Sequence, residues 1–193
     1  MKKVFIYNSF FRKANFEGAN MKSLFAIETN FEQTNFKKAN MEVCSFLESN
    51  FFYSEFREAF LKNAYFNRCF LSYVDFRGAD MRCIDLTGSD LTGALFEGAN
   101  LEDAVLIDIK GDGRYIKSLS LGGYPIAYTS DVIQIGLAQH KIEKWWDFSE
   151  EDISLVAVRD LREKDGENFS AWWNQWKPIL QKIIETSPAS PTM

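Results

Sequence analysis

The hydrophobic and polar positions of the first 109 residues repeat every five residues. Every fifth residue from Ile6 to Leu106 is apolar, and most of these residues are Phe, Met or Leu. The residue two positions earlier is Ala, Ser, Thr, Cys or Val, with only Leu24 and Ile84 as exceptions. A period of five matches neither the 3.6-residue period of a helix nor the two-residue period of a strand. The pattern therefore predicts a chain that turns once in every repeat.

A second period of twenty residues lies within the first. Residue identity recurs at this spacing in three columns: Phe16, Phe36, Phe56, Phe76 and Phe96; Met21, Met41, Leu61, Met81 and Leu101; and Ala19, Ala39, Ala59, Ala79 and Ala99. Four repeats would therefore make one coil, with equivalent residues of successive coils stacked. Coils stacked at the strand spacing of about 4.8 Å would number about five and would enclose a core with contacts only between neighbouring coils.

Several repeats share a common pattern, Ala followed by Asn or Asp and then by a large apolar residue. It is clearest at residues 14–18, 39–41, 79–81 and 99–103. Over about residues 4–109 the chain thus resembles the pentapeptide repeat family. The resemblance implies an all-β solenoid, a right-handed quadrilateral β-helix, and the handedness is expected from the resemblance alone.

Composition changes near residues 110–113, a turn-forming Lys-Gly-Asp-Gly segment. Of the 18 Phe, 16 precede this point, whereas all five Trp and all four Pro follow it. Two domains are therefore predicted: a β-helix over residues 1–109 and a capping module over residues 110–193. The module should cover the end of the solenoid, because an open last coil exposes core side chains and unpaired backbone.

The capping module has the pattern of a small α+β unit. Strands are predicted at residues 115–119, 124–128 and 132–135, each bounded by turn residues. Short helices are predicted at 141–147 and after Ser149, which with Asp152 forms a capping signal. A final amphipathic helix over about 169–185 should kink or break at Pro178, and the tail should fray from about residue 187.

Residues 133–140, followed by Trp145 and by residues 176–178, resemble a Trp-rich C-terminal module appended to solenoid-like proteins of bacteria and phages. The resemblance implies a bacterial or phage origin and no known activity. It leaves the role of the single histidine, His140, open.

The outward positions of the repeats separate into two polar and two apolar sides. The apolar sides supply a candidate interaction surface of eight residues: Phe25, Ile27, Leu47, Phe52, Tyr53, Tyr65, Phe70 and Tyr73. An apolar surface of this size is rarely left in contact with water. Three explanations are open: the C-terminal module covers it, a second copy or a partner protein does, or the side chains pack locally at the corners.

Acidic residues occupy the middle position of four successive repeats: Asp75, Asp80, Asp85 and Asp90. One interpretation is an acidic patch that mimics DNA, because the quinolone-resistance branch of the resembled family binds DNA gyrase in this way. The other is that short polar side chains at this position bond the backbone of the turn. The second interpretation is favoured, because the repeat region has only a small net negative charge.

The sequence contains no motif that indicates catalysis, a cofactor site or a metal site. His140 has no second ligand at metal spacing and adjoins Trp145, which suggests a packed residue rather than a base. Cys44 and Cys69 fall at inward positions, and Cys83 points outward without an activating neighbour. No phosphate-binding loop or nucleophile motif occurs. We expect a protein that is not an enzyme and needs no cofactor.

The net charge of −5 and the pI near 5.1 argue against direct binding of nucleic acid. Three cysteines without a pairing or ligand pattern suit a reducing compartment, and no apolar run approaches a membrane span, so we expect a cytoplasmic protein. The leading hypothesis is a non-catalytic protein–protein interaction scaffold acting on a partner protein or on itself as a homodimer. The alternatives are a DNA-mimicking binder of gyrase or another DNA-binding protein, and a structural component of a phage or cell assembly.

Overall fold

The structure, a computed structural model, describes residues 4–159 and 167–192 and divides into two compact units. Unit 1 is Met1–Gly113 with Thr192–Met193, and unit 2 is Arg114–Pro191. The main segment of unit 1 ends at Gly113, and the division into a β-helix of residues 1–109 and a capping module of residues 110–193 stays a prediction. A separate role for each unit stays a prediction.

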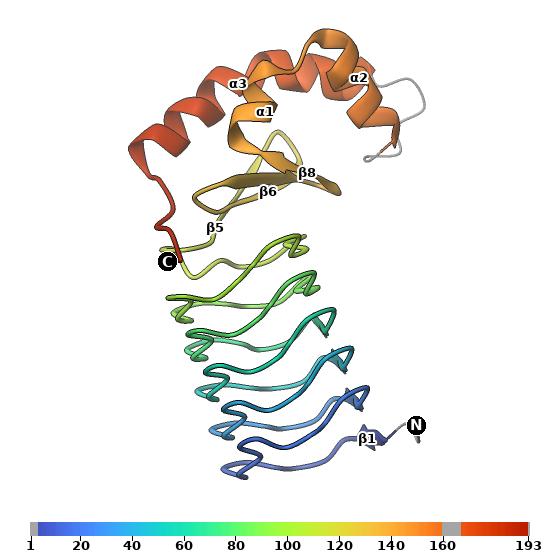
Figure 1. The fold of residues 1–193 in the computed structure, drawn as a ribbon. Coiled ribbons are helices and arrows are strands. Elements are labelled where there is room, and N and C mark those ends of the chain that lie inside the picture. Colours follow the sequence, from blue (N-terminus) through green and yellow to red (C-terminus); the bar gives the residue numbers. More distant parts are fainter. Residues whose placement is uncertain (1–3, 160–166, 193) are drawn as a thin grey trace. The chain divides into compact units, whose positions relative to one another are not determined.

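Unit 1 is a parallel β-helix in which the chain returns to the same place every twenty residues (Figure 1). Four short strands pair in the order β1-β2-β3-β4, with residues twenty apart directly opposite each other. Their bounds are β1 Phe5–Tyr7, β2 Phe25–Ile27, β3 Ser45–Leu47 and β4 Tyr65–Asn67. Isolated bridges such as Phe10↔Asn30, Asn15↔Asn35 and Asn20↔Asn40 continue this register along the other three sides. The predicted four-sided arrangement is confirmed, while its hand and number of coils stay predictions.

The turn in each repeat is made by the residue two positions after the large inward side chain. In every repeat from Asn8 to Asp108 this residue has a positive φ, between 43° and 72°. Type II turns need such a residue at their third position. The amide of Ala14 donates to the carbonyl of Phe11 at 2.9 Å and closes one of these turns. Most of the positions are not Gly, although a left-handed residue costs about 1–2 kcal/mol, so interactions between coils must offset that cost.

Hydrogen bonds between coils and stacked rings inside them provide this stabilisation. Phe36 illustrates both, because its amide donates to the carbonyl of Glu55 in the next coil at 2.7 Å. Its ring is fully buried, 5.5 Å from that of Phe16 and 4.7 Å from that of Phe56, in nearly parallel planes. The Phe column with a twenty-residue spacing is therefore the core of the β-helix.

The described part of unit 2 consists of an antiparallel sheet and three helices (Figure 1). The strands, in sheet order, are β5 Lys117–Leu121, β6 Tyr124–Tyr128, β7 Val132–Ile135 and β8 Ala138–Lys141, and the helices are α1 Ile142–Asp147, α2 Glu150–Arg159 and α3 Glu167–Thr186. The predicted α+β organisation is confirmed, with β6 and β7 at the predicted residues. Strand β8 was not predicted, because its sequence, Ala-Gln-His-Lys, has little strand character and follows β7 after only Gly136 and Leu137.

Tryptophans of α1 and α3 join the helices to the sheet. The Trp145 indole is fully buried and donates to the carbonyl of Ile133 in β7 at 2.9 Å. The Trp172 indole donates to the carbonyl of Leu121 at 2.8 Å, at the end of β5. Gly122 allows this contact, because a Cβ there would lie 2.6 Å from Nε1 of Trp172. The buried face of α3 thus docks on the sheet of unit 2.

Helix α3 runs through Pro178 without interruption, so the predicted local break does not occur, whereas a kink there stays a prediction. Proline removes one backbone hydrogen bond, but Trp173 and Leu180 on either side of it are buried in the unit 2 core. Packing on both sides of the proline holds the helix together.

The segment after α3 packs against unit 2. Ser190 donates its amide to the carbonyl of Arg114 at 2.7 Å, and the Tyr128 hydroxyl donates to the carbonyl of Ser187 at 2.8 Å. Ala189 is buried. Fraying of this tail in solution stays a prediction.

The Phe column predicts a large difference between two Phe→Ala substitutions in the same unit. Phe36→Ala removes a fully buried ring and should lower the free energy of unfolding by about 3–5 kcal/mol. Phe10→Ala, the matched control, changes a side chain that is 79% exposed and should cost no more than about 0.5 kcal/mol. Urea unfolding followed by circular dichroism measures both, and equal losses would contradict the stacked core.

Candidate interaction surface

The eight residues of the predicted interaction surface lie on two neighbouring sides of unit 1. Four of them flank the inward residues of β2, β3 and β4: Phe25, Ile27, Leu47 and Tyr65. Of these, Tyr65 is 46% exposed and the other three are half-buried. The remaining four, Phe52, Tyr53, Phe70 and Tyr73, belong to the next repeat along the coil and thus to the next side.

Three of the latter residues form a continuous aromatic strip: Phe52, Tyr53 and Tyr73. The rings of Tyr53 and Tyr73 stack at 5.0 Å with an interplanar angle of 13°. The ring of Phe52 meets both edge-on, 4.5 Å from Tyr53 and 5.7 Å from Tyr73. Tyr53 and Tyr73 are 50% and 46% exposed. Each tyrosine ring is therefore partly in contact with solvent and partly packed against the other rings of the strip.

Backbone conformation explains why these tyrosines project outward. Both occupy the left-handed turn position, with φ of 57° and 58°. In the next coil the equivalent residue is Gly93, and a Cβ there would lie 2.6 Å from the Tyr73 ring. The absence of a side chain at Gly93 therefore lets the Tyr73 ring lie over the adjacent coil.

A corner of the coil carries an acidic hollow of about 670 Å³. Among its lining residues are Glu28, Glu48, Arg68, Phe70, Asp90 and Asp108. Phe70 is 58% exposed and precedes Tyr73 by three residues in the same coil. The sequence analysis missed this hollow, although a signal exists: Glu28, Glu48, Arg68, Gly88 and Asp108 form one column at the twenty-residue spacing.

The aspartates of the predicted acidic patch bond the backbone of their own turns. Oδ1 of each accepts the amide hydrogen two residues later, at 3.1 Å for Asp75, 3.3 Å for Asp80, and 2.9 Å for both Asp85 and Asp90. Asn side chains do the same in other repeats, as between Asn35 and Lys37 at 2.9 Å. The middle position is thus a capping position for the turn, whichever of the two residues occupies it.

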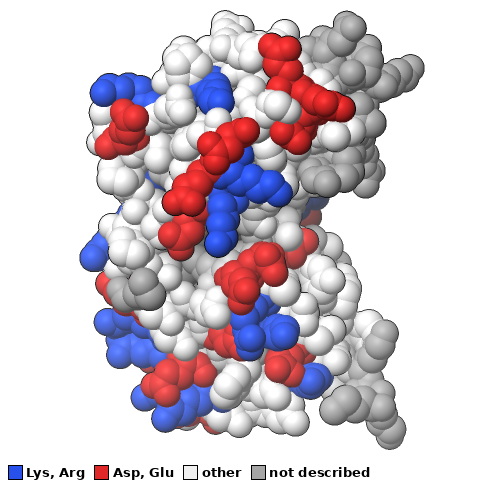
Figure 2. Space-filling model, turned by 45° about the horizontal axis from the view of Figure 1, so that its top comes forward, with Lys and Arg blue, Asp and Glu red and all other residues white. Residues whose placement is uncertain are grey.

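Three of the four aspartates are also paired with cations. Asp75 lies 2.5 Å from Nε of Arg57 and 2.7 Å from Arg77, and Asp80 lies 2.6 Å from Arg82. Lys110 lies 3.2 Å from Asp90. The side-chain hydrogen bond from Arg82 holds the pKa of Asp80 below its usual value. These ion pairs compensate the charge of Asp75, Asp80 and Asp90, and Figure 2 shows acidic and basic side chains next to one another over much of one face of the molecule.

Three of the residues considered for catalysis are packed or buried: His140, Cys44 and Cys69. The His140 ring meets Trp145 and Phe148 edge-on, at 5.3 and 5.0 Å. Burial raises the pKa of the Cys44 thiol to about 11 and that of Cys69 to about 12, so neither is a nucleophile at neutral pH. Cys83 is exposed, as predicted. In the described part of the chain, no group of three or more His, Cys, Asp or Glu side chains is arranged to hold a metal ion.

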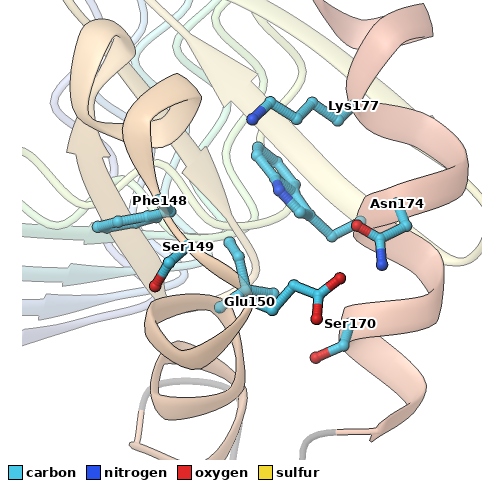
Figure 3. Close-up of a pocket in the computed structure, with 8 residues that line it drawn as sticks. Phe148, Ser149, Glu150, Ser170, Asn174 and Lys177 are labelled. Carbon is cyan, nitrogen blue, oxygen red and sulfur yellow. The ribbon is translucent and has the colours of Figure 1, made fainter.

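Unit 2 contains a cavity of about 70 Å³ between α2 and α3 (Figure 3). The labelled residues around it are Phe148, Ser149, Glu150, Ser170, Asn174 and Lys177. The Lys177 ammonium donates to the carbonyl of Trp146 at 2.8 Å and lies 5.6 Å from the centre of the Trp173 ring. The volume suits about two water molecules, so we assign the cavity a structural role.

Among the described residues, no helix is both long and apolar enough to cross a membrane.

The geometry of unit 1 defines a solenoid with a parallel register of twenty residues. Residues 25–96 match the family model of the pentapeptide repeat region. No curated protein sequence matches the chain. The resemblance of unit 2 to a Trp-rich C-terminal module is not confirmed by these comparisons.

Solved structures that resemble the chain include pentapeptide repeat proteins. Trypsin-treated QnrB1 R167E, a plasmid-mediated fluoroquinolone resistance protein, is 20% identical, with 56% of this chain and 76% of that chain covered and a TM-score of 0.28. A pentapeptide repeat protein from the thylakoid lumen of Arabidopsis thaliana is 22% identical, with coverages of 52% and 70% and a TM-score of 0.30. HetL from Nostoc sp. strain PCC 7120, involved in heterocyst differentiation regulation, is 17% identical, with coverages of 55% and 84% and a TM-score of 0.20. At these TM-scores the likenesses carry no argument about function.

The packing of Tyr73 over Gly93 predicts a specific effect of a methyl group. Gly93→Ala should displace the Tyr73 ring and change the near-ultraviolet circular dichroism of the tyrosines, in addition to the cost of an alanine at positive φ, about 1–2 kcal/mol. Gly18→Ala is the matched control, because Gly18 has a similar φ of 65° and nothing within 4 Å of its Cβ position. It should lose stability without a change in the tyrosine signal. The same signal change in both variants would contradict the stacking.

The ion pair between Asp80 and Arg82 predicts a pH-dependent contribution to stability. Because the pKa of Asp80 is lowered in the folded protein, the pair stabilises the fold above the usual aspartate pKa of about 3.9. This contribution is lost as the pH falls through the lowered folded pKa. Asp80→Asn should therefore be less stable than the wild type at pH 7, and the difference should shrink in strongly acidic solution.

The control for this prediction is Asp85→Asn. Asp85 accepts hydrogen bonds from the Thr87 amide and hydroxyl and forms no ion pair within the described residues. Asn retains the acceptor oxygen, so this variant should lose less stability than Asp80→Asn at pH 7. Urea unfolding across pH 2.5–7 separates the two, and parallel curves would argue against the ion pair.

Proposed function

We propose that the chain is a non-catalytic scaffold for protein–protein interaction and that the aromatic strip of unit 1 contacts the partner protein. The observation that carries this proposal is the half-exposed stack of Tyr53 on Tyr73, supported edge-on by Phe52. Phe70 and Tyr65 extend the aromatic surface along the two apolar sides.

The physical basis is a rigid surface of the residue type that dominates protein interfaces. Tyrosine supplies a large apolar area and a polar hydroxyl, and it is enriched among the residues that contribute most binding energy. Mutual stacking holds Tyr53 and Tyr73 in place before a partner arrives, so binding loses little side-chain entropy. Backbone hydrogen bonds to both neighbouring coils keep the underlying turns rigid.

The DNA-mimicking alternative has less support from charge. A mimic of duplex DNA needs exposed negative charge, but Asp75 is buried and bonded to two guanidinium groups. Asp80 and Asp90 are paired with Arg82 and Lys110.

A role in a larger structural assembly predicts self-association through the same aromatic surface. A measurement of solution mass separates self-association from binding to a different protein.

Two expectations from the sequence are part of this proposal. Unit 2 is proposed to act as the Trp-rich C-terminal module that its sequence resembles, with its aromatic residues used in its own core. A cytoplasmic location is proposed from the three free cysteines, of which Cys83 is exposed.

The test is the double substitution Tyr53→Asn and Tyr73→Asn. Asn tolerates the left-handed backbone of both positions, so the variant should fold while losing the stacked rings. A partner identified by cross-linking in native extract and then purified should bind the variant at least about tenfold more weakly than the wild type, because interface tyrosines often contribute more than 1.4 kcal/mol. Isothermal titration calorimetry measures the affinity.

The matched control is Lys38→Asn with Glu58→Asn. These residues are also twenty apart, occupy left-handed positions, and form an exposed ion pair at 3.6 Å on another side of the coil. This variant should retain binding. Equal binding by the tyrosine variant and the control would refute the proposed contact surface. Light scattering of the wild type alone shows whether the partner is a second copy.

A further inference from the structure

The first coil of unit 1, residues 4–23 (coil 1), has one side that faces away from the next coil, residues 24–43 (coil 2). In the described part of the chain, no strand or bridge pairs with coil 1 on this side. The four inward side chains of coil 1 are only half-buried: Ile6, Phe11, Phe16 and Met21. Their equivalents in coil 2 are fully buried: Ala26, Phe31, Phe36 and Met41. We propose that this open side of coil 1 binds the open side of coil 1 in a second copy of the chain, end to end.

Backbone groups of coil 1 also point to the open side. Asn35 shows the regular pattern, because its amide donates to the carbonyl of Ala14 at 3.0 Å and its carbonyl accepts an amide of coil 1 at 2.7 Å. Both groups therefore point toward the preceding coil. The equivalent residue of coil 1, Asn15, turns the same two groups to the open side, and so do Phe10 and Asn20 on the neighbouring sides. Open edges of this kind pair readily with another chain.

The rim of coil 1 carries the most exposed aromatic side chains among the described residues. Phe10, Phe5 and Tyr7 are 79%, 70% and 66% exposed. The side chains at the same three positions of coil 2 are all half-buried: Phe25, Ile27 and Asn30. Coil 2 has a coil on either side, which accounts for the difference. A second copy stacked on coil 1 would cover its aromatic rings in the same way.

The area of this contact reaches the size of a specific interface. Aromatic side chains have about 200 Å² of surface each, so covering the three rings to the level of coil 2 removes roughly 250 Å² per copy from water. Val4, which is 54% exposed, and the four half-buried inward side chains contribute a comparable area. The two copies together then bury about 1,000 Å², the size at which specific interfaces begin.

The pairing of backbone edges selects a second copy in the opposite orientation. Another coil end carries unpaired backbone on all four sides at the same spacing, as coil 1 does. A two-fold axis perpendicular to the solenoid reverses the chain direction, so the two coils would meet antiparallel. Residues that turn both amide and carbonyl toward the partner, as Asn15 does, form the paired hydrogen bonds of an antiparallel ladder. Such a contact is closed and isologous, the commonest form of homodimer.

The far end of the coil stack does not offer the same edge. In the middle of the stack the amide of Gly78 donates to the carbonyl of Glu97 in the next coil at 3.0 Å. At the equivalent position one coil later, the amide of Gly98 donates to the carbonyl of Thr192, which belongs to unit 1. A segment of the same chain thus occupies part of that edge. The end-to-end contact therefore gives a dimer rather than a filament.

Ion pairs within each copy reduce the repulsion between two coil ends. Three basic residues belong to coil 1: Arg12, Lys13 and Lys22. Arg12 lies 3.3 Å from Glu32, and Lys22 lies 2.6 Å from Glu42. Both acids are in coil 2, so the charge of two of the three basic side chains is compensated before the copies meet.

The experiment measures the mass of the full chain by sedimentation equilibrium over a range of concentrations. The wild type should form a species of twice the chain mass of 22.3 kDa. Phe5→Lys with Phe10→Lys, the end variant, places like charges at the rim and removes two of the rings. It should raise the dissociation constant at least about tenfold, because aromatic side chains contribute strongly to interfaces. A wild type that stays monomeric at its highest soluble concentration would overturn the proposal.

The matched control is Tyr65→Lys with Phe70→Lys. These residues occupy the same two columns three coils later and are 46% and 58% exposed. The control adds the same charge and removes the same kind of surface away from coil 1, so it should dimerise like the wild type. Equal dissociation constants for the end variant and the control would refute the end-to-end contact.

Amide hydrogen exchange locates the contact on the open side. The amides of Phe10, Asn15 and Asn20 should exchange more slowly in the wild-type dimer than in the end variant, because pairing with a second copy protects them. The amide of Asn35, which is bonded to coil 1 within the same copy, serves as the internal reference. A dimer in which the three amides exchange as fast as in the end variant would place the contact elsewhere.

The outcomes separate this inference from the proposed function. The variant Tyr53→Asn with Tyr73→Asn should remain dimeric, since the aromatic strip lies on a side of the coil and not at its end. If that variant is monomeric and the end variant is dimeric, self-association uses the aromatic strip and the end-to-end contact is wrong. A dimer also adds concentration-dependent stability, so Phe36→Ala and Phe10→Ala are compared at a concentration at which both are monomeric.

Discussion

Parallel backbone pairing between residues twenty apart holds the rest of unit 1 in place. Each repeat has one residue in the left-handed region, and most of these residues are not glycine. Such a conformation would be unfavourable in an isolated turn, at a cost of about 1–2 kcal/mol for each residue. Hydrogen bonds to the neighbouring coils, repeated on all four sides, and the buried Phe column offset that cost. The β-helix is therefore stable as a stack rather than as a set of separate turns.

Stacking converts each position of the repeat into a column with one physical role. The inward column is filled by large apolar side chains such as Phe36, and the Asn and Asp residues of the middle column cap the turn. The residues with positive φ form a different kind of column, because their side chains point outward and are not part of the core. Tyr53, Tyr73 and the acids of the hollow all belong to left-handed or outward columns, where residues can vary without loss of the fold.

Rigidity of the coil and variability of its outward columns together favour binding over catalysis. A catalytic group needs a dry pocket with converging polar side chains, whereas the aromatic strip is a half-exposed stack of rings. Unit 2 is built differently, with Trp145, Trp172 and Trp173 used in its own core, so its aromatic residues are not exposed in the same way.

The sequence alone determined the repeat, the register of the coils, the inward columns and the turn-capping role of the middle Asn and Asp. These features are predictable because each depends on residue types that recur along the sequence. The five-residue spacing defines the repeat, and the twenty-residue spacing shows which repeats stack on one another. Only the tertiary structure decided that Tyr73 lies over Gly93, that Phe52 supports the tyrosine stack, and that Glu28 and Asp108 line one hollow. It also decided that α3 continues through Pro178. The physical reason is that outward side chains and a proline within a helix take their conformation from neighbours in other coils or strands, which no local pattern specifies.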